Sequence, residues 1–134
     1  MKNNIEFFTR VLQDLFKTYK KKMRLNKNWS VTCETRDADG DYAEVEYDYK
    51  DRDFRARFNP EMNKTVKDLR DSIIHEFWHI LLAPMKDRFE RTLDKIEDGK
   101  TINIKRLRQQ IKNEDERLVR KFTQIILDLE RENK

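Results

Sequence analysis

The chain has few residues that could cross-link it or hold it in a membrane. Its 134 residues include one cysteine, Cys33, which excludes an internal disulfide and is typical of a protein from a reducing compartment. No segment approaches the ~20 consecutive apolar residues that span a bilayer. The charged first 19 residues lack the unbroken apolar stretch of a signal peptide. We therefore expect a soluble, cytoplasmic protein with no membrane partner.

Histidine is almost as scarce, since the chain contains only His75 and His79. A metal site with three histidine ligands from one chain is thereby excluded. Charged residues, by contrast, make up 42% of the sequence and hydrophobic residues 37%, so we expect a thin core beneath a heavily charged surface. The net charge of +4 is a mild excess that does not by itself indicate nucleic-acid binding.

Hydrophobic periodicity divides the first half of the chain into one helix and three strands. Apolar residues at spacings of three and four predict an amphipathic helix over residues 4–25. Alternation with a period of two predicts strands at residues 29–34, 43–49 and 54–58, with a polar turn at residues 37–41 after the first. Consecutive strands joined by short turns favour an antiparallel meander.

Helical spacing returns in the second half. It predicts a helix over residues 64–83, which Pro84 is expected to end, and a shorter helix over residues 85–96. A long final helix is predicted over residues 103–132. The sequence thus predicts an α+β fold in a single domain, residues 1–134, with an N-terminal helix, a three-stranded antiparallel meander, a histidine-bearing helix and C-terminal helices.

The segment His75-Glu76-Phe77-Trp78-His79 carries the strongest chemical signal. Side chains four residues apart lie one turn apart on the same helix face, so both imidazoles can bind one metal ion, and zinc suits such ligands. Glu76 lies about 100° around the helix from His75. We predict that Glu76 takes a proton from metal-bound water as a general base. The alternative is that both histidines are ordinary packed side chains.

A catalytic zinc site needs a third protein ligand besides a water molecule. Because no histidine remains, we expect the third ligand to be a carboxylate. Cys33 is a weaker candidate, because its position in a strand is better explained if it is a small buried apolar residue. The acidic run Glu114, Asp115 and Glu116 would reach the histidines if the final helix packed antiparallel to the metal helix. On a helical wheel, the apolar stripe through Ile125 and Leu129 and their apolar neighbours passes closest to Asp115 and then Glu114, with Glu116 to one side. The alternative for each of these three acidic residues is that its carboxylate faces solvent or pairs with a nearby arginine.

With these motifs, residues 29–129 resemble the minigluzincins, small metallopeptidase-like domains that include phage-encoded members and SprT-like relatives. The resemblance rests on the order of elements, on the HExxH motif followed by Ile-Leu-Leu-Ala-Pro, and on the acidic run before Leu118-Val119. It implies a zincin-like fold in which the first helix and the sheet back the metal helix. It also implies a glutamate as third ligand, as in gluzincins. Glu116 and Glu114 rank nearly level, Asp115 follows, and we take Glu116 as the ligand.

We expect zinc-dependent hydrolysis of a peptide bond in a peptide or protein substrate. A sheet edge can hold such a substrate as an added strand, although the sequence does not identify the edge. A second hypothesis keeps the fold and the metal without turnover, as an accessory or binding protein. A third is a protease associated with nucleic acid, suggested by the positive charge and the SprT-like resemblance.

Overall fold

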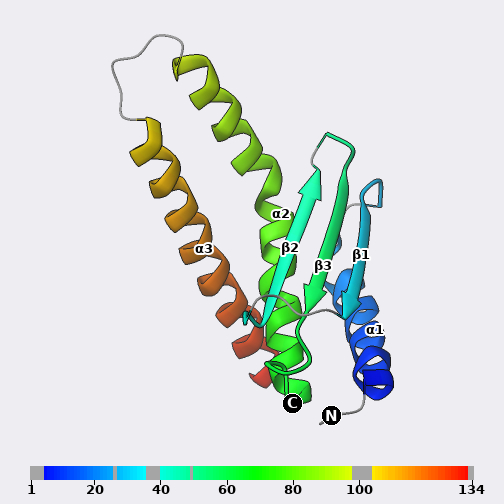
Figure 1. Ribbon diagram of the computed structural model, residues 1–134. Helices are drawn as coiled ribbons and strands as arrows, with labels where there is room; N and C mark the ends of the chain where they lie inside the picture. The colour runs from blue at the N-terminus through cyan, green and yellow to red at the C-terminus, as the bar shows by residue number, and fades with distance from the viewer. Residues whose placement is uncertain (1–4, 26, 36–39, 49, 98–103, 133–134) are drawn as a thin grey trace.

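The computed structural model describes residues 5–25, 27–35, 40–48, 50–97 and 104–132. Three helices and a three-stranded sheet make this an α+β fold, as predicted (Figure 1). In the ranges described, no helix combines the length and apolar character needed to cross a membrane. Most of the turn predicted at residues 37–41 lies outside the described residues. The elements are α1 (Ile5–Lys22), β1 (Ser30–Thr35), β2 (Ala43–Asp48), β3 (Asp53–Phe58), α2 (Val66–Glu97) and α3 (Ile104–Glu132).

The sheet is mixed, and the predicted antiparallel meander is wrong. Strand β3 lies in the centre, in the order β1-β3-β2. It pairs antiparallel with β2, where Ala43 lies opposite Phe58, and parallel with β1, where Val31 lies opposite Phe54. Alternation with a period of two identifies which face of a strand is buried but not which strand lies beside it, so the pattern could not exclude this order.

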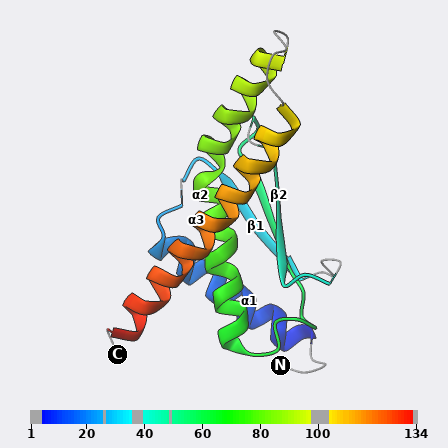
Figure 2. The ribbon, with the colours of Figure 1, turned by 90° about the vertical axis from the view of Figure 1, so that its left-hand side faces the viewer.

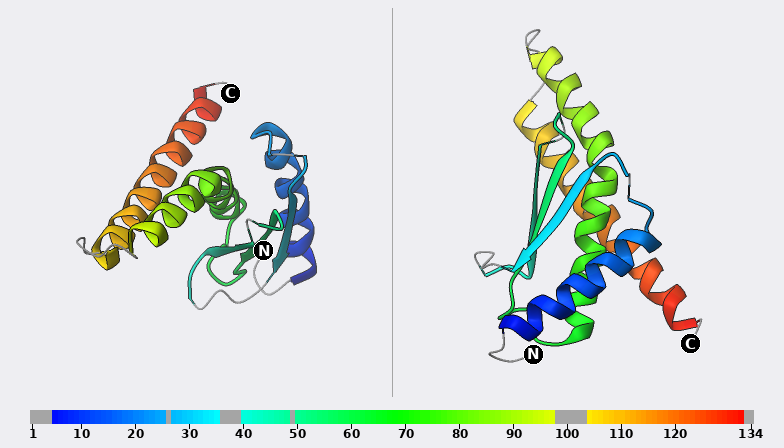
Figure 3. Two further views of the ribbon diagram at one scale, coloured as in Figure 1. Left: turned by 90° about the horizontal axis from the view of Figure 1, so that it is seen from above. Right: turned by 90° about the vertical axis from the view of Figure 1, so that its right-hand side faces the viewer.

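One face of the sheet, covered by α1 and α2, forms the core (Figure 3). Burying a large apolar side chain stabilises the fold by about 1.5–3 kcal/mol relative to leaving it exposed, so these contacts hold α2 firmly to the sheet. The buried side chains include Phe54, Ala56 and Phe58 of β3, Phe8, Leu12, Phe16 and Tyr19 of α1, and Leu69, Ile73, Ile74, Phe77 and Ile80 of α2.

The opposite face of the sheet carries a charged cluster around Arg57 of β3. Its guanidinium lies 2.8 Å from Glu34 of β1. Toward β2 it contacts Glu44 at 3.1 Å and Glu46 at 2.8 Å. One central arginine therefore links all three strands on the face away from the core.

Helix α2 is one helix of 32 residues, and not the two helices predicted at residues 64–83 and 85–96. Pro84 lies inside it. A proline removes one backbone hydrogen bond and crowds the preceding turn, which bends a helix without having to end it. Figure 2 shows α2 bending along its length while α3 runs back across it. Tertiary packing on both sides of the proline, against the core before it and α3 after it, outweighs the local preference to stop.

The range of helix α3 agrees closely with the predicted range 103–132. Its buried face, however, is rotated about the helix axis relative to the apolar stripe of the helical wheel. The positions buried against the rest of the molecule are Asp115, Val119 and Thr123, each four residues from the next. Ile125 and Leu129, which the wheel placed in the apolar stripe, are 45% and 53% exposed. This rotation decides which acidic side chains face α2.

Candidate metal centre

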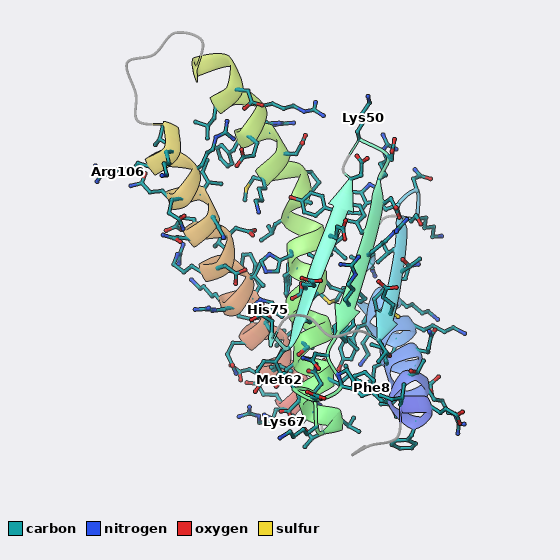
Figure 4. All side chains as sticks on the ribbon, viewed as in Figure 1. Phe8, Lys50, Met62, Lys67, His75 and Arg106 are labelled. Carbon is teal, nitrogen blue, oxygen red and sulfur yellow. The ribbon has the colours of Figure 1, made fainter. Side chains whose placement is uncertain are left out.

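Both histidines of the chain lie in the first half of α2. Figure 4 shows His75 on the side of α2 that faces α3. The ring centroids of His75 and His79 lie 5.0 Å apart. The carboxylate of Glu116 contacts both rings: Oε1 is 2.9 Å from Nε2 of His79, and Oε2 is 3.5 Å from Nε2 of His75. One ligand atom from each of the three residues lies within 4.8 Å of the others. Two imidazole nitrogens and one carboxylate oxygen at this spacing suit a zinc ion.

Glu116 reaches the histidines because of the rotational setting of α3. Asp115 and Val119 are buried, so they face the packed side of the helix. Residue 116 lies about 100° further round the helix, which places it off the buried stripe. The wheel was therefore right that Glu116 lies to one side, but that side is the one that faces His75 and His79.

Asp115 contacts the other nitrogen of His79. Its Oδ2 lies 2.9 Å from Nδ1, and its side chain is buried. When Nδ1–H donates to this carboxylate, the lone pair of Nε2 is left for a metal. Burial by itself lowers the pKa of His79, but the hydrogen bond to Asp115 and the charges of Glu76 and Glu116 outweigh burial and raise it. The pKa of His75 is lowered, by burial and by the neighbouring His79.

The other candidates for the third ligand lie elsewhere. Glu114 is on the exposed side of α3, where its carboxylate lies 2.9 Å from Nε of Arg117. Cys33 packs against the core from β1, and burial raises the pKa of its thiol to about 11, so the thiol stays protonated near neutral pH. Within the described part of the chain, Glu116 is the predicted candidate that joins both histidines.

Glu76, the predicted base, is buried beside this group, with 6% of its surface exposed. In the ranges that the structure describes, its carboxyl has neither a hydrogen bond nor an ion pair. A buried carboxylate without a partner is poorly solvated, so burial raises the pKa of Glu76 to about 7, against the opposing effect of His79. A carboxyl that titrates near neutrality can both accept and release a proton there.

These side chains open onto a cleft of about 880 Å³. Helices α2 and α3 form two of its walls, and residues 41–45 and 47, in and before β2, form the third. Strand β2 is an edge of the described sheet, since β3 is its one neighbour there. The free edge of such a strand offers N–H and C=O groups with which an extended peptide can pair.

A small polar network ties the start of this edge strand to α2. The side-chain amide of the buried Asn63 donates to the carbonyl oxygens of Tyr42 and Asn59, at 2.6 and 2.8 Å. The hydroxyl of Ser72, one turn before Glu76 on α2, donates to Asn63 Oδ1 at 2.6 Å. The network therefore ties the start of β2 to the turn of α2 that precedes Glu76.

Sequence reasoning singled out neither Tyr47 of β2 nor Arg120 of α3 as a cleft residue. Both line the cleft. Burial raises the pKa of the Tyr47 phenol, and the nearby charges of Asp115 and Asp87 raise it further. Arg120 stands four residues after Glu116, so counting one helical turn from Glu116 would have found it.

Comparison of the chain with protein-family models, with curated proteins and with solved structures gives no match in any of the three. The function therefore has to be argued from the geometry and chemistry of the site.

Proposed function

We propose that the protein is a zinc-dependent peptidase of the gluzincin type, with His75, His79 and Glu116 as ligands and Glu76 as the proton acceptor. One observation carries this proposal: the unpartnered buried carboxyl of Glu76 stands beside a group of two histidines and one glutamate. If the two histidines served only for packing, they would not need a charged side chain from another helix in contact with both rings.

Zinc bound to these three residues would lower the pKa of its water to about 7 and polarise a carbonyl group. The chain's own residues then transfer the protons. Glu76 accepts a proton as the water oxygen bonds to the carbonyl carbon, and it passes that proton to the amide nitrogen as the carbon–nitrogen bond breaks. One water molecule is consumed, and the products are a carboxylic acid and an amine.

Asp115 serves as a positioning residue in this proposal. Its contact with Nδ1 of His79 selects the tautomer in which Nε2 can bind metal and restrains rotation of the ring. The burial of Asp115 and the packing of its neighbour Val119 hold that carboxylate in place. Neighbouring residues of α3 thus provide a ligand, Glu116, and the group that orients another ligand.

The substrate that fits this site is an extended stretch of polypeptide. The free edge of β2 runs along the cleft that contains Glu76 and the histidines. Backbone pairing along this edge would bind peptides with little regard to sequence, because main-chain groups are common to all of them. The resemblance to minigluzincins, proposed on sequence motifs, agrees with this role.

The metal ligands are tested by measuring zinc in the wild type and in Glu114→Ala, Asp115→Ala and Glu116→Ala. We expect one zinc ion per chain in the wild type, near-complete loss in Glu116→Ala, a weakened site in Asp115→Ala and full retention in Glu114→Ala. Equal retention by all three variants would show that the metal is held elsewhere.

Catalysis is tested with Glu76→Gln, which keeps the shape of the side chain and removes its proton-accepting role. Cleavage of a mixture of unstructured peptides, followed by mass spectrometry, is expected to fall by about 10²–10⁴-fold with zinc still bound. Glu114→Gln is the matched control and should keep wild-type activity. Full activity in zinc-loaded Glu76→Gln would contradict the mechanism, and a wild type that binds zinc but cleaves nothing would favour the accessory binding role instead.

A further inference from the structure

Arg120 is a cationic side chain of the cleft that the proposed roles above do not use. It lines the cleft together with His75 and Glu116 and stands one turn of α3 beyond Glu116. The other cations of that lining are Lys86 and Lys112, and Lys86 already lies 4.0 Å from Asp115. Within the described cleft lining, Arg120 is therefore the arginine that lies beside the proposed ligands.

The surroundings of Arg120 leave its guanidinium available. Glu116, at the i−4 position where an ion pair would form on a helix, is turned to the two histidines instead. In the ranges described, no carboxylate pairs with Arg120, whereas Arg117 on the same helix pairs with Glu114 at 2.9 Å.

A positive charge beside a cation site weakens metal binding, unless an anionic group is present there during function. The carbonyl oxygen of a peptide becomes such a group during hydrolysis. As the water oxygen bonds to the carbonyl carbon, the electron pair of the C=O double bond moves onto that oxygen, and the pair returns when the carbon–nitrogen bond breaks. A guanidinium offers several N–H donors in one plane and is well suited to an oxyanion.

We propose that Arg120 donates hydrogen bonds to the carbonyl oxygen of the bond to be cleaved and stabilises the negative charge that develops on it. This inference rests on the proposed peptidase function. It gives Arg120 a role that differs from that of Glu76, because Arg120 binds the oxygen that gains charge and Glu76 moves the proton.

The test compares Arg120→Met and Arg120→Lys with Arg117→Met, a matched control on the same helix outside the cleft lining. Each zinc-loaded protein is titrated with two peptides of one sequence. One carries a phosphinate, whose tetrahedral anion resembles the charged oxygen, and the other carries a neutral ketomethylene group. Zinc affinity and the kcat and KM for the parent peptide are measured in parallel.

In Arg120→Met, we expect phosphinate affinity and kcat to fall by about 10²-fold, as on removal of one oxyanion donor. Ketomethylene affinity and KM should change by less than about 3-fold, since the neutral carbonyl gains little from a charged donor. Arg120→Lys should recover part of the loss because it keeps the charge but not the planar donors. Arg117→Met should match the wild type, and zinc affinity should not fall in any variant.

Several results would overturn the inference. Equal losses for the two peptides would make Arg120 a general binding residue, and a loss of zinc in Arg120→Met would make it part of the scaffold. A defect confined to the KM of peptides with a free C-terminal carboxylate would assign Arg120 to that carboxylate. A wild type that binds no zinc would instead overturn the peptidase proposal together with this inference, whereas unchanged phosphinate binding by zinc-loaded Arg120→Met would overturn the inference alone.

Discussion

Helix α2 has two halves that meet at Pro84 and differ in what holds them. Before the proline, the helix packs against the sheet and α1, and side chains such as Ile73 and Phe77 are fully buried. Beyond it, Met85 and Phe89 are 43% and 49% exposed, and Leu93 is buried outside the main core cluster. Much of the link to α3 there is ionic, since Arg108 pairs with the carboxylates of residues 90 and 94.

The difference explains where a metal site can be built. The residues His75, Glu76 and His79 all lie in the half that the core immobilises. A ligand set needs its atoms held to within a fraction of an ångström, and dense apolar packing provides this, whereas partly exposed ion pairs contribute about 0–1 kcal/mol each. The half beyond Pro84 extends the walls without carrying any of the proposed ligands.

The largest expected effect comes from truncating one aromatic residue in each half. Phe77→Ala removes a fully buried ring that packs edge-on against Phe16, with centroids 4.8 Å apart, and should lower the free energy of unfolding by about 3–5 kcal/mol. Phe89→Ala, on a half-exposed ring, should change it by less than about 1 kcal/mol. Denaturant unfolding measures both. Similar losses would show that the two halves are packed equally well.

The second-largest expected effect follows from the raised pKa of Glu76 in the metal-free protein. Its folded pKa, about 7, exceeds its ordinary value of 4.5, so the folded state keeps a proton that the unfolded state releases between these values. Stability is therefore lost as the pH rises from about 4.5 to 7. Glu76→Gln stays neutral, so we expect it to exceed the wild type by on the order of 3 kcal/mol at pH 8 and to match it near pH 4.

Unfolding curves of the two proteins at several pH values check this prediction. Zinc must be removed with a chelator, because a bound cation would lower the pKa of the carboxyl. A difference between Glu76→Gln and the wild type that did not change with pH would show that the pKa of Glu76 is the same in the folded and unfolded states.

A smaller effect is expected from Asp115→Asn, which leaves the shape of the contact with His79 and removes its charge. Loss of such a supporting group should weaken zinc binding by about 10–100-fold, as measured by competition with a chromogenic chelator. Glu114→Gln, the matched change at the preceding position, should bind zinc as the wild type does. Equal affinity in both variants would remove Asp115 from the metal centre.

The smallest effect is expected beyond Pro84, from Arg108→Ala. Its partners Glu90 and Asp94 are partly exposed, so the loss of stability should be at most about 1 kcal/mol, and it should shrink further at 1 M salt. Zinc content should not change. A loss of zinc in this variant would contradict the idea that the site is positioned without the ion pairs beyond Pro84.

Much of the secondary structure could be predicted because it depends on local spacing. The stripe of Phe8, Leu12, Phe16 and Tyr19 predicted α1, and alternation predicted that Phe54, Ala56 and Phe58 face the core, which the structure confirms. The continuity of α2 through Pro84 could not be predicted in this way. A proline's preference is a local energy, and contacts with residues far along the chain outweigh it here.

The sequence by itself determined the candidate metal-binding residues of α2: two histidines four residues apart with Glu76 beside the first, a relation set by the helical repeat alone. Only the tertiary structure shows that, among the acidic residues Glu114, Asp115 and Glu116, it is Glu116 that contacts both histidines. These three residues are consecutive in α3, so a rotation of that helix about its axis would exchange their roles. That rotation is set by how side chains such as Val119 pack against the rest of the molecule, and no local pattern records it.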